Sequence, residues 1–366
     1  METEDSALWR AVVAAPHDDA PRLIYADWLE EHGEPERAEF VRVQCRLARL
    51  DDDAPDRPAL ERRERHLWQK YKCAWRAGLP ARMRECPFRR GFVHPKAVSL
   101  TPKQFLQLGD DDLARAPLWD VRLKLRGPGS LAGLADTDRL RRLAGLELDC
   151  AGLEPAHLSR FLATPGLCNV RALALWGGPY TLDHVRAVSN SPLSTRLTHL
   201  AVRSAPGLGP EGAEALAAAD GLRRLEVLEL VNCGLRDAGL RMLLNSPHLA
   251  ALKELRVPYN WLTASAVRAL FECRHLKGLR VLDLGYNRLD DDGARVLALW
   301  PAGDRLTQLD LGWNRIHRPG AESLAQSPFL AGVRDLSLLG NPCANDQATV
   351  TGLRFRFSDR VRLTSR

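Results

Sequence analysis

The side chains that could carry out chemistry are scattered, and few lie at spacings that would bring them together. Acid–base or nucleophilic catalysis needs a convergent group of titratable side chains. His17, Asp18 and Asp19 are consecutive, which is more typical of a loop and a helix N-cap than of a general-base pair. Cys150 has no histidine beside it in the sequence to activate it. Gly127-Pro128-Gly129 lacks the Gly-Lys-Ser/Thr that completes a phosphate-binding loop, so we expect no enzyme and no catalytic residues.

The cysteines show neither a Cys-x-x-Cys pair nor a histidine spacing that would make a zinc site. The segment Met1–Asp5 is acidic and lacks the apolar stretch of a secretory signal, and no apolar run is long enough to span a membrane. We therefore expect reduced thiols in a cytoplasmic protein, with no disulfide, metal or cofactor. The eight cysteines are Cys45, Cys73, Cys86, Cys150, Cys168, Cys233, Cys273 and Cys343.

The net charge of +6 is spread unevenly along the chain. Residues 1–50 hold six Lys and Arg against eleven Asp and Glu, whereas residues 57–96 hold twelve against three. The basic segment carries Trp68, Tyr71 and Trp75 among its arginines, a pattern that is one indication of nucleic-acid binding. The alternative is a helix whose rings pack inward and whose arginines face the acidic segment. We favour this second interpretation because the opposite charge is so near in the sequence.

The rest of the chain repeats the pattern Leu-x-x-Leu-x-Leu-x-x-Asn/Cys-x-Leu. Four copies match it closely, those over residues 225–235, 252–262, 279–289 and 306–316. Successive copies start 25 to 28 residues apart, and such a near-constant period predicts a repeat array. The nine copies begin at Leu118, Leu143, Val170, Leu197, Leu225, Leu252, Leu279, Leu306 and Val333.

Each repeat has room for a strand, a turn and an amphipathic helix. The fourth and sixth positions of a copy point to one side of the strand and the fifth to the other, because side chains alternate along a strand. The sequence therefore predicts an α/β solenoid, with a curved parallel sheet inside and helices outside, behind a small all-α domain. The side chain at the ninth position can form hydrogen bonds with the backbone of the turn, where the peptide groups have no partner in the sheet. The residues at this position are Cys233, Asn260, Asn287, Asn314 and Asn341.

The eighth position of three consecutive repeats is aromatic, at Tyr259, Tyr286 and Trp313. Neighbouring strands lie about 4.8 Å apart, so these rings can form one column on the concave face. Gly285 and Gly312, in the adjacent column, are expected to leave room for the rings. An aromatic column bordered by charges suits a binding hot spot, but rings that only stack and stiffen the strand ends are an equal alternative. The neighbouring charges are Glu229, Glu254, Arg256, Asp283, Asp310 and Asp335.

Over residues 118–343 the chain resembles the ribonuclease-inhibitor-like class of leucine-rich repeats. The motifs that carry the resemblance are Asn287-Arg288-Leu289-Asp290-Asp291-Asp292-Gly293-Ala294 and Cys233-Gly234-Leu235-Arg236-Asp237-Ala238-Gly239. The resemblance implies a concave, parallel-stranded face that binds proteins, and it implies no catalytic residues. The earlier repeats depart from the pattern, since Ala151, Gly178 and Ala205 stand at the asparagine position.

The N-terminal segment reads as three short helices. The first covers residues 6–14, the second begins at Asp18 or Asp19 and ends at Gly33, and the third covers residues 35–50. The string Tyr25-Ala26-Asp27-Trp28-Leu29-Glu30-Glu31-His32-Gly33, followed by Arg37-Ala38-Glu39-Phe40, is similar to a repeat-companion domain that precedes leucine-rich repeats in some bacterial proteins. This resemblance implies no activity.

These observations predict four parts of the chain. They are a small helical domain over residues 1–50, a basic helical linker and N-terminal cap over 51–117, the repeats over 118–343, and a C-terminal cap over 344–366. Within the caps we expect residues 88–117 to cover the first repeat, and residues 346–357 and 361–363 to form a last helix and strand.

The function that the sequence favours is a monomeric scaffold that binds an unidentified protein on its concave face. One alternative is association with nucleic acid through residues 57–96. A further alternative is a cysteine-dependent transferase of the kind sometimes fused to such repeats.

Overall fold

The computed structural model describes residues 4–14, 18–50, 54–77, 79, 83–84, 86–93, 99–109, 120–125, 127–131, 133–149, 152–178 and 180–363. His17, Leu118, Cys150 and Ala151, on which sequence predictions fell, lie outside these residues, as does the expected boundary between 117 and 118. The chain divides into two compact units. One comprises residues 1–124, 130–147 and 166–169, and the other residues 125–129, 148–165 and 170–366.

The first unit begins with four helices, of which consecutive ones contact each other. The second helix starts where Asp18 Oδ1 accepts a 2.9 Å hydrogen bond from the Ala20 amide, and it ends before Gly33, whose φ of +85° suits glycine. The four helices are α1 (Glu4–Ala14), α2 (Ala20–Glu31), α3 (Pro35–Arg49) and α4 (Arg57–Ala77).

A short antiparallel hairpin, β1 (Phe88–Arg89) and β2 (Phe92–Val93), packs with these helices. The Phe40 ring of α3 lies 5.9 Å from the Trp68 ring of α4 and 6.2 Å from the Phe88 ring of the hairpin. Residues 88–93 therefore share the core of the helical unit, whereas they were expected in the cap over the first repeat. The division expected at residue 50 also runs through this shared aromatic core.

The repeats form an 11-stranded sheet in which the strands follow one another in chain order. Neighbouring strands from β6 to β13 pair in parallel. Leucines at equivalent positions pair across them, for example Leu255 with Leu228 and Leu282. The nine predicted strands are β4 to β12, and a short strand extends the sheet at each end, which confirms the predicted fold class. The strands are β3 (Ser99–Leu100), β4 (Asp120–Lys124), β5 (Gly145–Asp149), β6 (Ala172–Trp176), β7 (His199–Arg203), β8 (Val227–Val231), β9 (Glu254–Arg256), β10 (Val281–Asp283), β11 (Gln308–Asp310), β12 (Asp335–Ser337) and β13 (Val361–Arg362).

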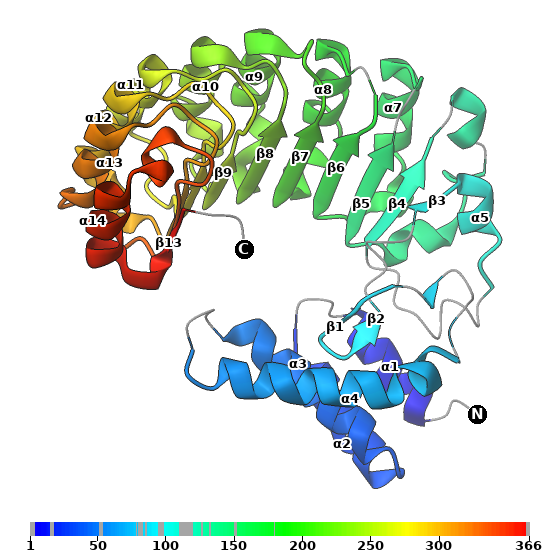
Figure 1. Cartoon of the computed structure of the whole chain (residues 1–366). Coiled ribbons are helices and arrows are strands. Elements are labelled where there is room, and N and C mark those ends of the chain that lie inside the picture. The colour runs from blue at the N-terminus through cyan, green and yellow to red at the C-terminus, as the bar shows by residue number, and fades with distance from the viewer. Residues whose placement is uncertain are drawn as a thin grey trace. The chain divides into compact units, whose positions relative to one another are not determined.

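Helices return the chain from one strand to the next. In the second unit, strands β6 to β13 line the inner side of a curved array and the helices lie on its outer side (Figure 1). The last helix and strand match the segment expected to close the array. The helices of the repeats and their ends are α5 (Pro102–Leu106), α7 (Pro155–Leu162), α8 (Leu182–Ser189), α9 (Gly209–Ala217), α10 (Arg236–Leu244), α11 (Ala264–Glu272), α12 (Asp291–Ala298), α13 (Arg318–Ala325) and α14 (Gln347–Phe357).

The repeated leucines form the core between strands and helices. Leu228, Leu230 and Leu235 of one repeat are fully buried, and so are Leu255 and Leu262 of the next. Within a strand the alternate positions stay partly exposed on the concave side. Burial of a leucine side chain contributes roughly 1.5–3 kcal/mol, so this column is the main source of stability of the array.

Buried asparagines join the turns of neighbouring repeats. Asn287 is 8% exposed, and its Oδ1 accepts hydrogen bonds from the amides of Asn260 (2.8 Å) and Leu262 (3.0 Å) in the preceding repeat. Its Nδ2 donates to the carbonyl oxygens of Val257 and Leu284. Side chains at the same position in the repeats on either side make corresponding bonds, so the turns are linked into one ladder. The further members are Asn260, Asn314 and Asn341.

No helix among the described residues has the length and apolar character to cross a bilayer. The seven cysteines that the structure describes are free thiols. Within the described part of the chain, no three His, Cys, Asp or Glu side chains gather closely enough to hold a metal ion.

Because the buried asparagines link the turns, we expect that replacing one of them lowers the stability of the protein strongly. Asn287→Ala removes the acceptor of two buried amides, each of which costs about 1–3 kcal/mol when left unpaired. We expect the free energy of unfolding, measured by urea denaturation, to fall by roughly 3 kcal/mol or more. The matched control is Asn245→Ala, which replaces an exposed asparagine. It should change the free energy of unfolding by about 0.5 kcal/mol at most. Equal stability of the two variants would contradict the role of the ladder.

Candidate functional site

The eighth position of the repeats adopts a left-handed backbone conformation from Gly177 to Gly340. The φ angles are 59° at Tyr259, 53° at Tyr286 and 55° at Trp313, and Ser204 and Asn232 share this conformation. A left-handed residue other than glycine costs about 1–2 kcal/mol. The conformation turns the chain at the end of each strand and directs the side chain away from the core, toward solvent.

The three aromatic rings stack into one column. The centroids of Tyr259 and Tyr286 lie 4.1 Å apart with 14° between the ring planes, and those of Tyr286 and Trp313 lie 5.4 Å apart with 11°. The three residues remain 40% to 49% exposed. The column ends over Gly340, where a Cβ would lie 2.5 Å from Cδ2 of Trp313. The arrangement therefore combines mutual stacking with an open aromatic surface.

Gly285 and Gly312 lie against the carboxylates of Asp283 and Asp310. The Gly285 amide donates to Asp283 Oδ1 at 2.9 Å, and the Gly312 amide donates to Asp310 Oδ1 at 2.8 Å. A Cβ on Gly285 would lie 3.2 Å from the same Asp283 oxygen. The glycines leave room for carboxylates that fold back on the turn, and the ring of Trp313 extends over Gly340 of the next repeat. Whether the glycines also leave room for the rings stays a prediction.

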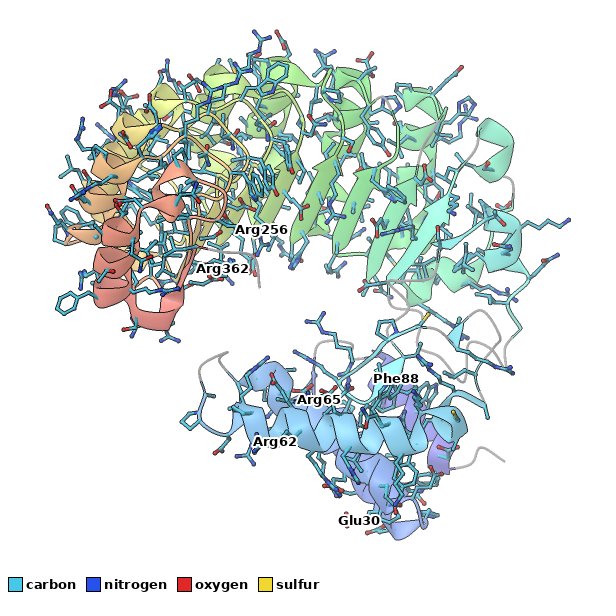
Figure 2. The ribbon with its side chains drawn as sticks, viewed as in Figure 1. Glu30, Arg62, Arg65, Phe88, Arg256 and Arg362 are labelled. Atoms are coloured by element: carbon cyan, nitrogen blue, oxygen red, sulfur yellow. The ribbon has the colours of Figure 1, made fainter. Side chains whose placement is uncertain are left out.

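The charged residues beside the column fall into two groups. Glu229, Glu254 and Asp335 are in ion pairs, with Arg203 (2.6 Å), Arg256 (2.5 Å) and Arg362 (2.8 Å) respectively. These pairs lie on the strand side of the array, where Figure 2 labels Arg256 and Arg362.

Asp283 and Asp310 form the second group and occupy paired register positions on neighbouring strands. Arg362 approaches Asp310 to 3.8 Å, so Asp310 has a distant cation. Burial, with a smaller contribution from Asp310, raises the pKa of Asp283 to about 6. The Gly285 amide acts in the opposite direction. Strands β10 and β11 therefore hold two carboxylates side by side, and the pKa of one of them is raised to about 6.

Cys233 is unsuited to act as a nucleophile. Its Sγ donates to the Val202 carbonyl at 3.3 Å, and burial raises the pKa of the thiol to about 12. A thiol is reactive as the thiolate, which this environment disfavours. Cys150, the cysteine considered from the sequence as a nucleophile, lies outside the described residues.

The rings of the basic segment pack inside the helical unit. The Trp75 ring lies 4.7 Å from Phe40, and the Tyr71 hydroxyl donates to Glu36 at 2.8 Å. Arg63 forms two hydrogen bonds with Glu39, at 2.7 and 2.6 Å. Arg62 and Arg65 are exposed on α4 (Figure 2). The rings that would stack on bases are thus engaged with the protein, while part of the positive charge faces solvent.

Sequence reasoning missed Trp261, which is 49% exposed and lies between two arginines at the edge of the repeats. The sequence does contain a feature that could have identified it. Trp261 follows the turn residue Asn260, whereas glycine (Gly234) stands at the same position in the preceding repeat.

The pKa of Asp283 leads to a pH-dependent prediction. An aspartate has an ordinary pKa of about 3.9, so the folded state binds this proton more tightly than the unfolded state does. The ionised carboxylate therefore lowers stability above about pH 6, and this loss disappears toward pH 4. Asp283→Asn keeps an acceptor for the Gly285 amide. We expect it to raise the melting temperature by roughly 2–4 °C at pH 8 and to have little effect at pH 4.

The matched control is Asp335→Asn, because Asp335 is paired with Arg362. This variant should give no stabilisation at pH 8. A lower melting temperature of Asp283→Asn at pH 8 would contradict the assigned cost of the buried charge.

Comparison with known proteins gives one family, described as "Leucine Rich repeat", which matches residues 194–217, 275–298 and 306–325. No curated protein matches the chain. Among solved structures the chain is similar to one in "Crystal structure of Rad7 and Elc1 complex in yeast", with 14% identity, a TM-score of 0.48, and coverage of 90% of this chain and 87% of that one. The family matches coincide with the strand–helix period of the sheet. The three matched segments are leucine-rich repeats within this solenoid.

Proposed function

We propose that this protein is a non-catalytic interaction module that holds a protein partner on the concave face of its C-terminal repeats. The proposal is based on the stacked, solvent-exposed column of Tyr259, Tyr286 and Trp313. Tyrosine and tryptophan dominate binding hot spots because they bury a large area and lose little entropy. Leucine-rich repeats are generally an interaction fold, which supports the same class of function.

The surroundings of the column suggest what the partner offers. The aromatic surface favours apolar or cationic side chains, because a cation over a ring face is attracted by it. Asp283 and Asp310 lie on the same repeats as Tyr286 and Trp313 and add negative charge. A partner segment that combines aromatic or aliphatic residues with Lys or Arg would match both features. The paired residues Glu229, Glu254, Arg256 and Asp335 would then form the rim of the contact.

The same proposal includes the class of the repeats, the nature of the helical unit, the oligomeric state and the cellular location. We propose that the repeats are of the ribonuclease-inhibitor-like class, since a period of 27 residues accommodates a full helix such as α10 or α12. We also propose that the helical unit is a repeat-companion domain, and that the protein acts as a monomer in a bacterial cytoplasm.

Association with nucleic acid remains the second candidate, through the exposed arginines of α4. It is disfavoured because Trp68 and Trp75 pack on Phe40 and because Arg63 is paired with Glu39. Single-strand binding usually combines a basic groove with free aromatic rings, and these rings are not free.

The proposal predicts that the rings can be removed without loss of the fold. Tyr286→Asn and Trp313→Asn suit the left-handed backbone, which Asn232 adopts in the same column. Each should weaken the complex about thirtyfold, the effect of losing a central hot-spot aromatic. The partner is first isolated by affinity capture and identified by mass spectrometry, and its Kd is then measured with purified proteins.

The control is Phe355→Asn, which removes a ring that is 91% exposed on α14, away from the column. It should leave the Kd unchanged, and thermal unfolding of all three variants should stay close to that of the wild type. Ring variants that bind like the wild type but unfold several degrees earlier would show that the column is structural.

A further inference from the structure

A second exposed aromatic group lies at the edge of the repeats, beyond the concave column. Trp261 follows the buried ladder residue Asn260 and is 49% exposed. The guanidinium carbon of Arg236 lies 5.6 Å from the centre of its ring, and that of Arg288 lies 5.5 Å away. These residues, with Asp237 and Ala238, line a hollow of about 460 Å³.

The backbone of Trp261 is left-handed, with φ of 59°. At the corresponding position two other repeats have Gly152 and Gly234, with φ of 79° and 67°. Glycine adopts this conformation without the cost that a tryptophan incurs. The repeat that holds Trp261 thus keeps a large exposed ring where glycine would be more stable. Such local strain is found preferentially at sites that bind ligands.

The hollow carries positive charge that the protein does not neutralise. Arg236 and Arg288 are exposed, and no carboxylate among the described residues forms an ion pair with either. Asp237 is the nearest acid in the lining, but its carboxylate already accepts hydrogen bonds from the Thr263 amide (2.8 Å) and hydroxyl (2.6 Å). In the next repeat, Arg315 is exposed at the position that Arg288 occupies in its own repeat.

We propose that this hollow binds an acidic peptide segment of a protein partner. Carboxylates of the segment would pair with the guanidinium groups of Arg236 and Arg288, which can bind a carboxylate through two parallel hydrogen bonds. The indole of Trp261 would cover the apolar part of the same segment. The site lies outside the aromatic column, so it goes beyond the interaction proposed for the concave face.

The charge pattern favours a short peptide over a nucleic acid. The hollow has the size of one or two side chains. Asp283 lies on the strand of the repeat that holds Arg288, and Asp310 lies on the strand of the next repeat. A long polyanion that extended onto the concave face would be repelled by these carboxylates. An acidic peptide can place a few carboxylates at the arginines without extending over the concave carboxylates.

The test uses the full chain and a fluorescein-labelled octaglutamate peptide, with binding measured by fluorescence anisotropy at low salt. The wild type should bind saturably. Trp261→Gly, which keeps the left-handed backbone, and Arg288→Glu should each weaken binding about tenfold or more. Arg268→Glu changes the net charge equally at an exposed arginine of α11 in the repeat of Trp261, and it should change the affinity less than about twofold.

Three results would overturn the proposal. The first is an absence of saturable binding by the wild type, and the second is an equal loss in Arg268→Glu, which would indicate a diffuse charge effect. The third is a thymidine oligonucleotide of the same net charge that binds at least as tightly as the peptide. Tyr286→Asn should bind octaglutamate like the wild type, so failure of the concave-face proposal would be recognised separately.

Discussion

The structure depends on the conformation of the turn that follows each strand of the repeats. The eighth residue turns into the left-handed region, and the ninth, an asparagine in the C-terminal repeats, is buried and bonded to the turn of the repeat before it. The asparagine satisfies amides that have no ladder partner. Because these bonds pass from repeat to repeat, they hold the turns in register and stabilise a backbone conformation that is unfavourable for Tyr286 or Trp313 alone.

The surface chemistry follows from this turn. A left-handed residue at the strand end carries its side chain out of the core, so aromatic residues at three successive turns become one stacked column. The residue three positions earlier ends the strand, and there Asp283 and Asp310 accept hydrogen bonds from the amides of Gly285 and Gly312. The residue two positions later, Trp261, reaches the edge, where Arg236 and Arg288 approach it. The same repeat geometry therefore presents an acidic aromatic face and a basic aromatic edge.

The order of the repeat strands could be predicted from the period of the leucines, and the last strand at Val361–Arg362 from the need to close the end of the array. The alignment of Tyr259, Tyr286 and Trp313 also follows from the period. Their left-handed backbone could not be read from aromatic residues, although Gly177, Asn232 and Gly340 in the same column were a signal. The contact of Gly285 with the Asp283 carboxylate could not be predicted, because it depends on how that side chain folds back on the turn. The hairpin at Phe88 has no repeat pattern, and its packing on Phe40 depends on a long-range contact.

If the aromatic column contacts the partner, site-specific photocrosslinking should capture that contact. Benzoylphenylalanine at position 286 keeps an aromatic ring in the column, and the same group at position 355 places it on α14. We expect a covalent adduct with the captured partner after irradiation from position 286 and none from position 355. Adducts from position 355 with none from position 286 would contradict the proposed contact.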